Sequence, residues 1–350
     1  MLKEKKIQIG TIRVNAKSLK SFKMTAAGWK LFKKDFPELN TAVKLFKVNN
    51  RFKTLIDLKN PLFLKGELSK EGQERGARIN ILPNGKKLEK AFSLFSPYLK
   101  IHDQDSHDHW DVIYKNKGGT FSYVYTLEKR KQHQNKKYKK VHLFAKHFFK
   151  LRINVTKALK DKYDEMAVPM HTLLNTNMRI GNEIYYKAHG HKGLTTLVKG
   201  DVKVKGNGVT FNYVGKDGVP IQIFKHFSPI YISRLKYTLK QRKTNDFVFS
   251  INNRMLYEQD FKKAFQKYCG HEFYPHIVRS HFATIRVEKF LKNKSKVTKE
   301  ESQQLFLEIA HELGHKKFNK KTNEWQDHYA VTVNSYIRPE LVETLNKRII

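Results

Sequence analysis

Cysteine is almost missing from this sequence, and so are long apolar runs. Cys269 is the one cysteine in 350 residues, which excludes a disulfide framework and a zinc site rich in thiolates and fits a reducing compartment. No stretch is apolar enough to span a bilayer, so we expect no membrane partner. Residues 1–6 carry charges where a signal peptide would be apolar. We expect a location in the cytoplasm or nucleoid, or in a virion or nucleus if the source is viral or eukaryotic.

Acidic residues are also scarce. The chain has 32 Asp and Glu against 69 Lys and Arg, which leaves a formal net charge of +37. A net charge of this size opposes folding through self-repulsion. Proteins that carry such a charge usually use it to bind a polyanion. We therefore predict double-stranded DNA as the partner. With 39% hydrophobic and 12% aromatic residues, the chain is typical of a globular protein, and its length suffices for two domains.

The first third of the chain predicts short strands. Period-two alternation or β-rich runs predict strands, and Asn40 is a candidate cap for a short helix. A run of lysines from 129 to 140 is interpreted either as a solvated loop or helix face, or as a linker facing DNA phosphates. We place the domain boundary there, giving an N-terminal DNA-clamp domain at 1–135 and a catalytic domain at 136–350. The predicted strands are 7–14, 77–82, 110–114 and 120–125, the last two joined by a turn at 117–119, and the helix is 41–46.

The remainder predicts a mostly helical domain with one small antiparallel sheet, and hence an α+β fold class overall. Apolar residues recur at helical spacing in six segments, one of which would carry Arg179. Three further segments are typical of strands. The helices are predicted at 141–159, 168–186, 230–239, 258–268, 276–291 and 301–313, and the strands at 202–204, 210–214 and 220–224.

Five residues of this second part form a candidate catalytic set: Arg179, Lys216, Arg279, His315 and Tyr336. Breaking a phosphodiester without a metal requires a nucleophile, neutralisation of charge on the phosphate, and a proton for the leaving oxygen. A tyrosine can attack phosphorus, two arginines can clamp the non-bridging oxygens, a histidine can donate one more hydrogen bond, and a lysine can protonate the 5′ oxygen. No cofactor and no metal is needed for this chemistry.

The order of these motifs resembles that of type IB DNA topoisomerases of the bacterial and poxviral type, which are relatives of tyrosine recombinases. The resemblance covers most of residues 107–350, and the segments that carry it are 179–183, 193–197, 214–218, 276–284, 313–315 and 333–339. It implies a monomer that clamps duplex DNA, nicks one strand through a 3′-phosphotyrosyl bond, allows rotation and rejoins the strand without ATP.

Two departures leave alternatives open. His276 stands three residues before Arg279, where recombinases commonly carry His and topoisomerases commonly carry Lys, so a site-specific tyrosine recombinase is the main alternative. His315 and Tyr336 are 336 − 315 = 21 residues apart, a long gap for the family. An insertion at 316–327 would explain this gap, and it makes Tyr329 a rival nucleophile. Only 350 − 336 = 14 residues follow Tyr336, so a helix exchanged between recombinase subunits would be short.

Less specific interpretations also exist. His311-Glu312-Leu313-Gly314-His315 matches a zinc-protease pattern, in which both histidines share one helical face. That interpretation leaves the charge and the Arg, Lys and Tyr residues unexplained. Arg179 could simply pair with Glu183 one helical turn later, and the whole chain could be a basic DNA-binding protein without catalysis.

Overall fold

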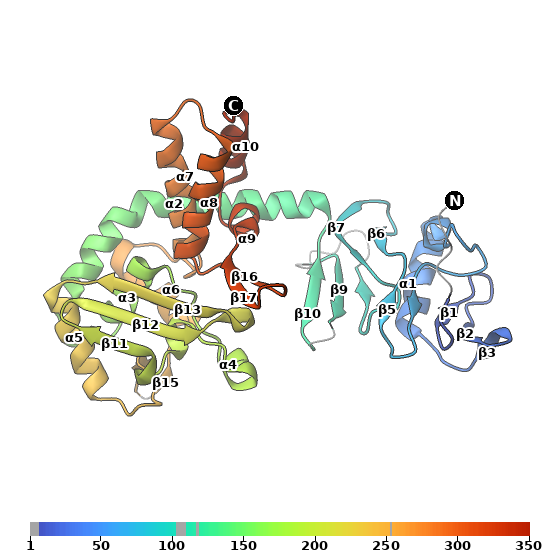
Figure 1. Cartoon of the computed structure of the whole chain (residues 1–350), viewed down its shortest axis with the longest axis horizontal. Helices are drawn as coiled ribbons and strands as arrows, with labels where there is room; N and C mark the ends of the chain where they lie inside the picture. The colour runs from blue at the N-terminus through green and yellow to red at the C-terminus, as the bar shows by residue number, and fades with distance from the viewer. Residues whose placement is uncertain (1–6, 103–109, 117–118, 253) are drawn as a thin grey trace. The chain divides into compact units, whose positions relative to one another are not determined.

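The computed structural model describes residues 7–102, 110–116, 119–252 and 254–350. The chain divides into two compact units, Met1–Lys136 and Lys137–Ile350 (Figure 1). The assignment of a clamp role to 1–135 and of catalysis to 136–350 stays a prediction.

The described residues of unit 1 form short antiparallel strands and one main helix, α1 (Pro37–Val48). Its largest sheet has the order β3-β2-β1-β4-β5, beside a three-stranded sheet β10-β9-β8 and the hairpin β6-β7. The buried face of α1, with Leu39, Val43 and Phe46, packs into the core of this unit. The strands are β1 (Ile12–Val14), β2 (Ser21–Thr25), β3 (Gly28–Phe32), β4 (Glu67–Leu68), β5 (Glu74–Arg75), β6 (Ile79–Ile81), β7 (Lys87–Phe92), β8 (Lys100–Ile101), β9 (Val112–Lys115) and β10 (Phe121–Val124).

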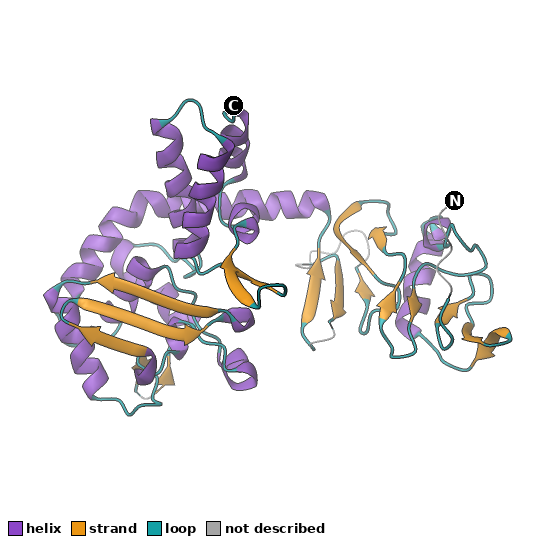
Figure 2. Cartoon of the chain, in the orientation of Figure 1, coloured by secondary structure: helices purple, strands orange, loops and turns teal. Residues whose placement is uncertain are grey.

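Unit 2 is mostly helical around one long-stranded antiparallel sheet of order β11-β12-β13 (Figure 2). Buried Val209, Phe211 and Tyr213 alternate with more exposed residues along β12, as expected for a sheet with one covered face. Its elements are α2 (Leu127–Ala158, which begins in unit 1), α3 (Ala167–Thr176), α4 (Glu183–His189), β11 (Val202–Lys205), β12 (Gly208–Val214), β13 (Pro220–His226), α5 (Pro229–Lys240), β14 (Ser250–Ile251), β15 (Arg254–Met255), α6 (Glu258–Cys269), α7 (Ile277–Asn293), α8 (Lys299–Glu312), β16 (Lys316–Asn319), β17 (Glu324–Asp327), α9 (Ala330–Ser335) and α10 (Pro339–Lys347).

Helix α7 takes part in both hydrophobic cores of unit 2. Its first residues, Ile277 and Val278, pack with α2, α3, α6 and the sheet. Farther along, Ala283 and Val287 pack with residues of α8 and α10. Arg279 therefore lies where α7 passes from one core to the other, held on both sides by packed side chains.

The α+β class is confirmed, and so are the strands β11, β12 and β13 and the pairing of β9 with β10. The predicted strand 7–14 is shortened to β1, because Gly10 turns the chain at a φ of +92°. Helix α1 starts at Pro37 and contains Asn40, so Asn40 is not its cap. Residues 1–6, 107–109 and 117–118, which enter the predictions above, lie outside the described residues.

Two further predictions concerned helices. The basic run at 129–140 lies inside α2 and is mostly exposed, so the solvated helix face is confirmed and the loop is wrong. The predicted helix 168–186 is confirmed at its two ends but is wrong as one continuous helix. Helix α3 stops at Thr176, because Asn177 adopts a left-handed φ of 53° and closes the helix on the Leu173 carbonyl. Among the described residues, no helix has the length and apolar character needed to cross a membrane.

Candidate active site

Arg179 lies on the loop between α3 and α4, not on a helix as predicted. The neighbouring segment that begins at Gly193 packs tightly on this loop, and Leu194 donates its backbone N–H to the Arg179 carbonyl at 2.8 Å. A Cβ at Gly193 would lie 2.6 Å from that same carbonyl oxygen. Only glycine fits there, which explains why the Gly-Leu-Thr-Thr-Leu segment at 193–197 accompanies Arg179.

Lys216 starts the tight turn between β12 and β13, as predicted. The turn depends on Asp217 and Gly218, whose φ angles are +62° and +78°. The Lys216 side chain is exposed, and it makes no hydrogen bond or ion pair with any residue that the structure describes. The turn thus carries an ammonium group that is available to a ligand.

Arg279 is almost fully buried, with 2% of its surface exposed. Its Nη1 donates to the Asn177 carbonyl at 2.6 Å and its Nη2 to the Leu313 carbonyl at 2.8 Å. Its Nε is buried without a partner, and no carboxylate pairs with it in the described part of the chain. Burial accordingly lowers the pKa of the guanidinium. A buried cation without a counter-ion is costly unless an anion binds there.

His315 follows Gly314, which turns the chain after α8 at a φ of +64°. Its Nε2 is 3.0 Å from Arg279 Nη2 and its Nδ1 is 2.7 Å from Thr332 Oγ1. Because arginine only donates, Nε2 accepts and the proton sits on Nδ1. Burial and the neighbouring arginines lower the pKa of His315 to about 3. In this arrangement His315 orients Arg279, and its predicted donation to a phosphate stays a prediction.

Tyr336 follows the last residue of α9 and is 4% exposed. The guanidinium groups of Arg279 and Arg179 lie 5.2 and 5.8 Å from the centre of its ring. The ring of His315 is 4.9 Å away. Four of the five predicted residues therefore meet around one phenol, while Lys216 reaches the same region from its turn without touching the ring.

His276 belongs to this cluster, although the sequence singled it out only as a departure from the family pattern. Its Nε2 lies 3.1 Å from the Tyr336 hydroxyl and 3.1 Å from Arg179 Nη1. Burial first, and then Arg279 and Arg179, lower the pKa of His276 to about 3. Because arginine only donates, His276 Nε2 is an unprotonated acceptor, and it lies within hydrogen-bond distance of both Arg179 Nη1 and the Tyr336 hydroxyl. Its position one helical turn before Arg279 was the signal that could have identified it.

Lys137 is a second contact that sequence reasoning missed. Its ammonium lies 5.4 Å from the centre of the Tyr336 ring and donates to the carbonyl of Ser335. Nothing in the lysine run at 129–140 distinguished it, because 137 and 335 are far apart in sequence. Only the packing of α2 against the end of α9 brings them together.

The rival nucleophile Tyr329 lies elsewhere. It packs against Phe306 at a ring distance of 5.8 Å, in the core that α7, α8 and α10 share. The suspected insertion is the hairpin β16–β17, in which Lys316 pairs with Asp327. The chain therefore leaves His315 and returns close to it before α9 begins.

The structure also bears on the two simpler interpretations. Glu183 pairs with Lys187 at 2.7 Å, whereas Arg179 contacts His276. Helix α8 ends at Glu312, so the two histidines of the zinc-protease pattern do not share a helical face: His311 contacts Asp327 and His315 contacts Arg279. Within the described residues, no group of three His, Cys, Asp or Glu side chains is placed to hold a metal.

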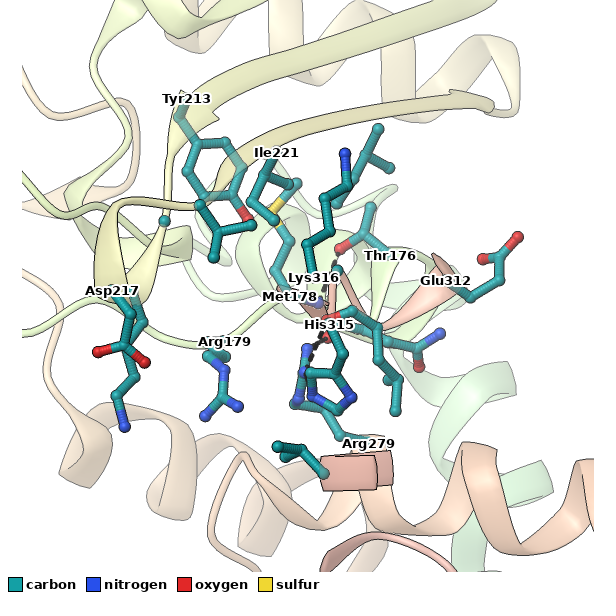
Figure 3. A pocket seen from close by; sticks show the side chains of 18 of the residues that line it. Thr176, Met178, Arg179, Tyr213, Asp217, Ile221, Arg279, Glu312, His315 and Lys316 are labelled. Carbon is teal, nitrogen blue, oxygen red and sulfur yellow. Dashed lines mark hydrogen bonds between the residues drawn. The ribbon is translucent and has the colours of Figure 1, made fainter. Parts of the chain in front are cut away.

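A pocket of about 210 Å³ opens between these elements, and Arg179, Lys216, Arg279 and His315 are among its lining residues. In Figure 3, Arg179, Arg279 and His315 surround one space, and Asp217 marks the turn that faces them. The site thus combines three cations and a histidine around a small volume beside Tyr336. Chemically it is suited to hold a phosphate group and to expose it to a phenolic oxygen.

Comparison with known proteins gives one family match. The profile of the eukaryotic DNA topoisomerase I catalytic core matches residues 127–338, a span that includes every residue of the site. Among curated proteins none matches the chain.

Similar solved structures include two of the XerH site-specific recombinase. The complex with difH substrate before cleavage is 17% identical, with a TM-score of 0.32, covering 47% of this chain and 44% of that one. The complex with palindromic difH after cleavage is 17% identical, with a TM-score of 0.33, covering 49% and 45%. The match thus spans less than half of the recombinase chain.

Proposed function

The chain belongs to the family of the eukaryotic DNA topoisomerase I catalytic core, and from this premise we propose that it is a type IB DNA topoisomerase. It would relax supercoiled DNA by transient cleavage of one strand through a 3′-phosphotyrosyl bond, without ATP and without a metal. The family places the chain among enzymes that break and rejoin DNA. We propose, beyond the family itself, the type IB mechanism, the residue roles and the bacterial or poxviral subtype.

One observation carries the proposal: Arg179, Arg279 and His276 surround Tyr336. Within the described residues, the buried guanidinium of Arg279 has no carboxylate partner. A phosphate in the adjoining pocket would supply the missing negative charge. Two arginine forks can then bind its non-bridging oxygens and stabilise the charge that develops on them during attack.

The reaction is a transesterification in which the number of phosphodiester bonds is conserved. The Tyr336 oxygen attacks phosphorus, and the bond from phosphorus to the 5′ oxygen breaks. The phenolic proton passes toward His276 Nε2, 3.1 Å away, and Lys216 gives a proton to the leaving 5′ oxygen. Bound phosphate offsets the two arginines that lower the pKa of His276, and so makes it a better acceptor. Rejoining is the reverse reaction, which is why no ATP is needed.

Most of the net charge of +37 would serve binding of duplex DNA. Lysine contacts with phosphates position a duplex but read no sequence, and they weaken as salt concentration rises. We therefore propose a monomer that binds double-stranded DNA with little sequence preference. Binding should fall steeply with salt, whereas the cleavage step on bound DNA should change little.

The test is relaxation of supercoiled plasmid in EDTA without ATP, followed as linking number. The wild-type protein should relax the plasmid stepwise, and Tyr336→Phe should abolish relaxation and the covalent protein–DNA adduct while DNA binding persists. Tyr329→Phe is the matched control, because it removes the same hydroxyl from the rival position and should retain activity. Full activity of Tyr336→Phe would overturn the proposal, and binding without any adduct in the wild type would leave a non-catalytic DNA-binding protein.

A site-specific tyrosine recombinase is the second candidate, and His276 is the observation that favours it. Against it stands α10, whose Leu341 and Leu345 are buried in a core of the same chain, so this helix has a partner within its own subunit. The mass of the protein on DNA separates the two: a monomer supports the topoisomerase, and a tetramer formed on particular sites supports the recombinase.

A further inference from the structure

Two consecutive residues of α2 hold the backbone on either side of Tyr336. Lys137 Nζ donates to the Ser335 carbonyl, and the Tyr138 hydroxyl donates to the Ile337 carbonyl at 2.6 Å. These bonds join positions 198 and 199 residues apart in sequence. Tyr138 and Ile337 are both buried, with exposures of 8% and 0%, so water does not compete for the second bond.

The arrangement constrains the side chain between the two carbonyls. Tyr336 follows a helix of only six residues, and a helix this short does little to fix its own end. The Lys137 ammonium lies 5.4 Å from the centre of the Tyr336 ring, and the guanidinium groups of Arg179 and Arg279 lie near the same ring. Small displacements of an attacking atom have large kinetic costs, because in-line attack needs a narrow range of distance and angle.

We propose that Lys137 and Tyr138 are positioning residues for Tyr336: the charged ammonium of Lys137 and the hydroxyl of Tyr138 fix the segment 335–337 so that the phenolic oxygen faces the phosphate pocket. This inference rests on the proposed function, since it assigns Tyr336 as the attacking group. Neither residue touches the reacting atoms, so neither is a catalytic residue in the strict sense.

The charge on Lys137 is itself sensitive to pH. Burial lowers the pKa of Lys137 to about 8. The titratable groups near it are Tyr336 after α9, Tyr138 on its own helix and His276 before α7, and Lys137 is among the cations that lower the pKa of His276. Glu340 of α10 faces Tyr138 and, after burial, helps to raise the pKa of its hydroxyl. Tyr138 therefore stays a hydrogen-bond donor throughout the range in which Lys137 loses its charge.

The first experiment compares Lys137→Met with Lys139→Met, an exposed lysine on the same helix. With enzyme in excess over supercoiled plasmid, Lys137→Met should slow relaxation and adduct formation ~100-fold, as expected for a misplaced attacking group. Lys139→Met should stay within about twofold of the wild type, since it removes at most one phosphate contact. DNA affinity should change equally in the two variants. A relaxation rate of Lys137→Met equal to that of Lys139→Met would overturn the proposal.

Tyr138→Phe tests the second bond with minimal change in packing. It should slow adduct formation ~10-fold while leaving DNA affinity unchanged. A loss of thermal stability without a loss of rate would show that the hydroxyl only supports the fold, and would contradict its positioning role.

Lys137→Arg separates the charge from the fold, because arginine stays protonated across the accessible pH range. The ratio of the wild-type rate to the Lys137→Arg rate should fall as pH rises from 7 to 9.5, beginning at or above about pH 8 because a bound phosphate raises the lysine pKa. A constant ratio would overturn the role of the charge.

The proposed function and this inference fail in different ways. If the wild-type protein forms no adduct, or forms one that survives Tyr336→Phe, the proposed function fails. If the adduct depends on Tyr336 but neither Lys137→Met nor Tyr138→Phe slows its formation, only the positioning inference fails.

Discussion

The two sides of the candidate site hold their cations in opposite ways. On one side Arg279 is buried between two cores and bonded to two carbonyls and a histidine. On the other side Lys216 sits on an exposed turn. Arginine cannot give up its proton in a protein, whereas lysine can. The buried side is therefore suited to hold charge in a fixed place, and the exposed side is suited to move and to deliver a proton.

The largest expected effect is that of Arg279→Ala on the buried side. It should slow adduct formation ~1,000-fold, as loss of a preorganised donor to a developing oxyanion does. It also leaves the Asn177 and Leu313 carbonyls without their donor, so the free energy of unfolding should fall by about 1–3 kcal/mol. Single-turnover cleavage and denaturant unfolding measure the two effects. A variant that loses activity but keeps full stability would show that these bonds matter little to the fold.

Lys216→Ala on the exposed side should affect chemistry alone. Adduct formation should slow ~100-fold through loss of the proton donor, and stability should stay within about 0.5 kcal/mol of the wild type. A substrate with sulfur in place of the leaving 5′ oxygen needs no proton, so it should restore the rate for Lys216→Ala but not for Arg279→Ala. Equal deficits on both substrates would argue against proton donation by Lys216.

The last expected effect is confined to acid and concerns stability. The pKa of His276 lies at about 3 in the folded chain and near 6.5 in an unfolded one. Between these values the unfolded chain binds more protons, so the free energy of unfolding should fall as pH falls from about 6.5 toward 3. His276→Gln should make this slope shallower by roughly one proton, measured by chemical unfolding at several pH values. An unchanged slope would mean that folding does not lower the pKa of His276.

Short-range patterns accounted for much of the fold. Strand-like segments at 202–204, 210–214 and 220–224 predicted β11, β12 and β13, and apolar spacing along Phe144, Leu151 and Val155 predicted the buried stripe of α2. The helix expected at 168–186 failed for a local reason, since apolar residues continue past Thr176 and nothing in their spacing reveals the left-handed Asn177. The left-handed conformation of this one residue is therefore the reason that Arg179 lies on a loop and not on the predicted helix.

Residue type and motif order predicted that Arg279 and Tyr336 belong to one site, and the two side chains do lie together, while their catalytic roles stay predictions. The site was not predictable where long-range packing selects one residue from many of its kind. Lys137 is one of several lysines in its run, and its contacts with Ser335 and with the Tyr336 ring distinguish it. His276 lies between these cases, because its spacing from Arg279 was visible but its contact with the Tyr336 hydroxyl was not.

The hairpin β16–β17 has a practical consequence for labelling and for motif searches. Because Lys316 and Asp327 face each other across the two strands, residues can be added or removed at the tip without changing where the chain enters or leaves. A fluorophore or a short peptide attached near Asn323, at the turn, would leave the separation of His315 and Tyr336 in space unchanged. For the same reason, a search that fixes the number of residues between a histidine and a tyrosine would overlook chains built in this way.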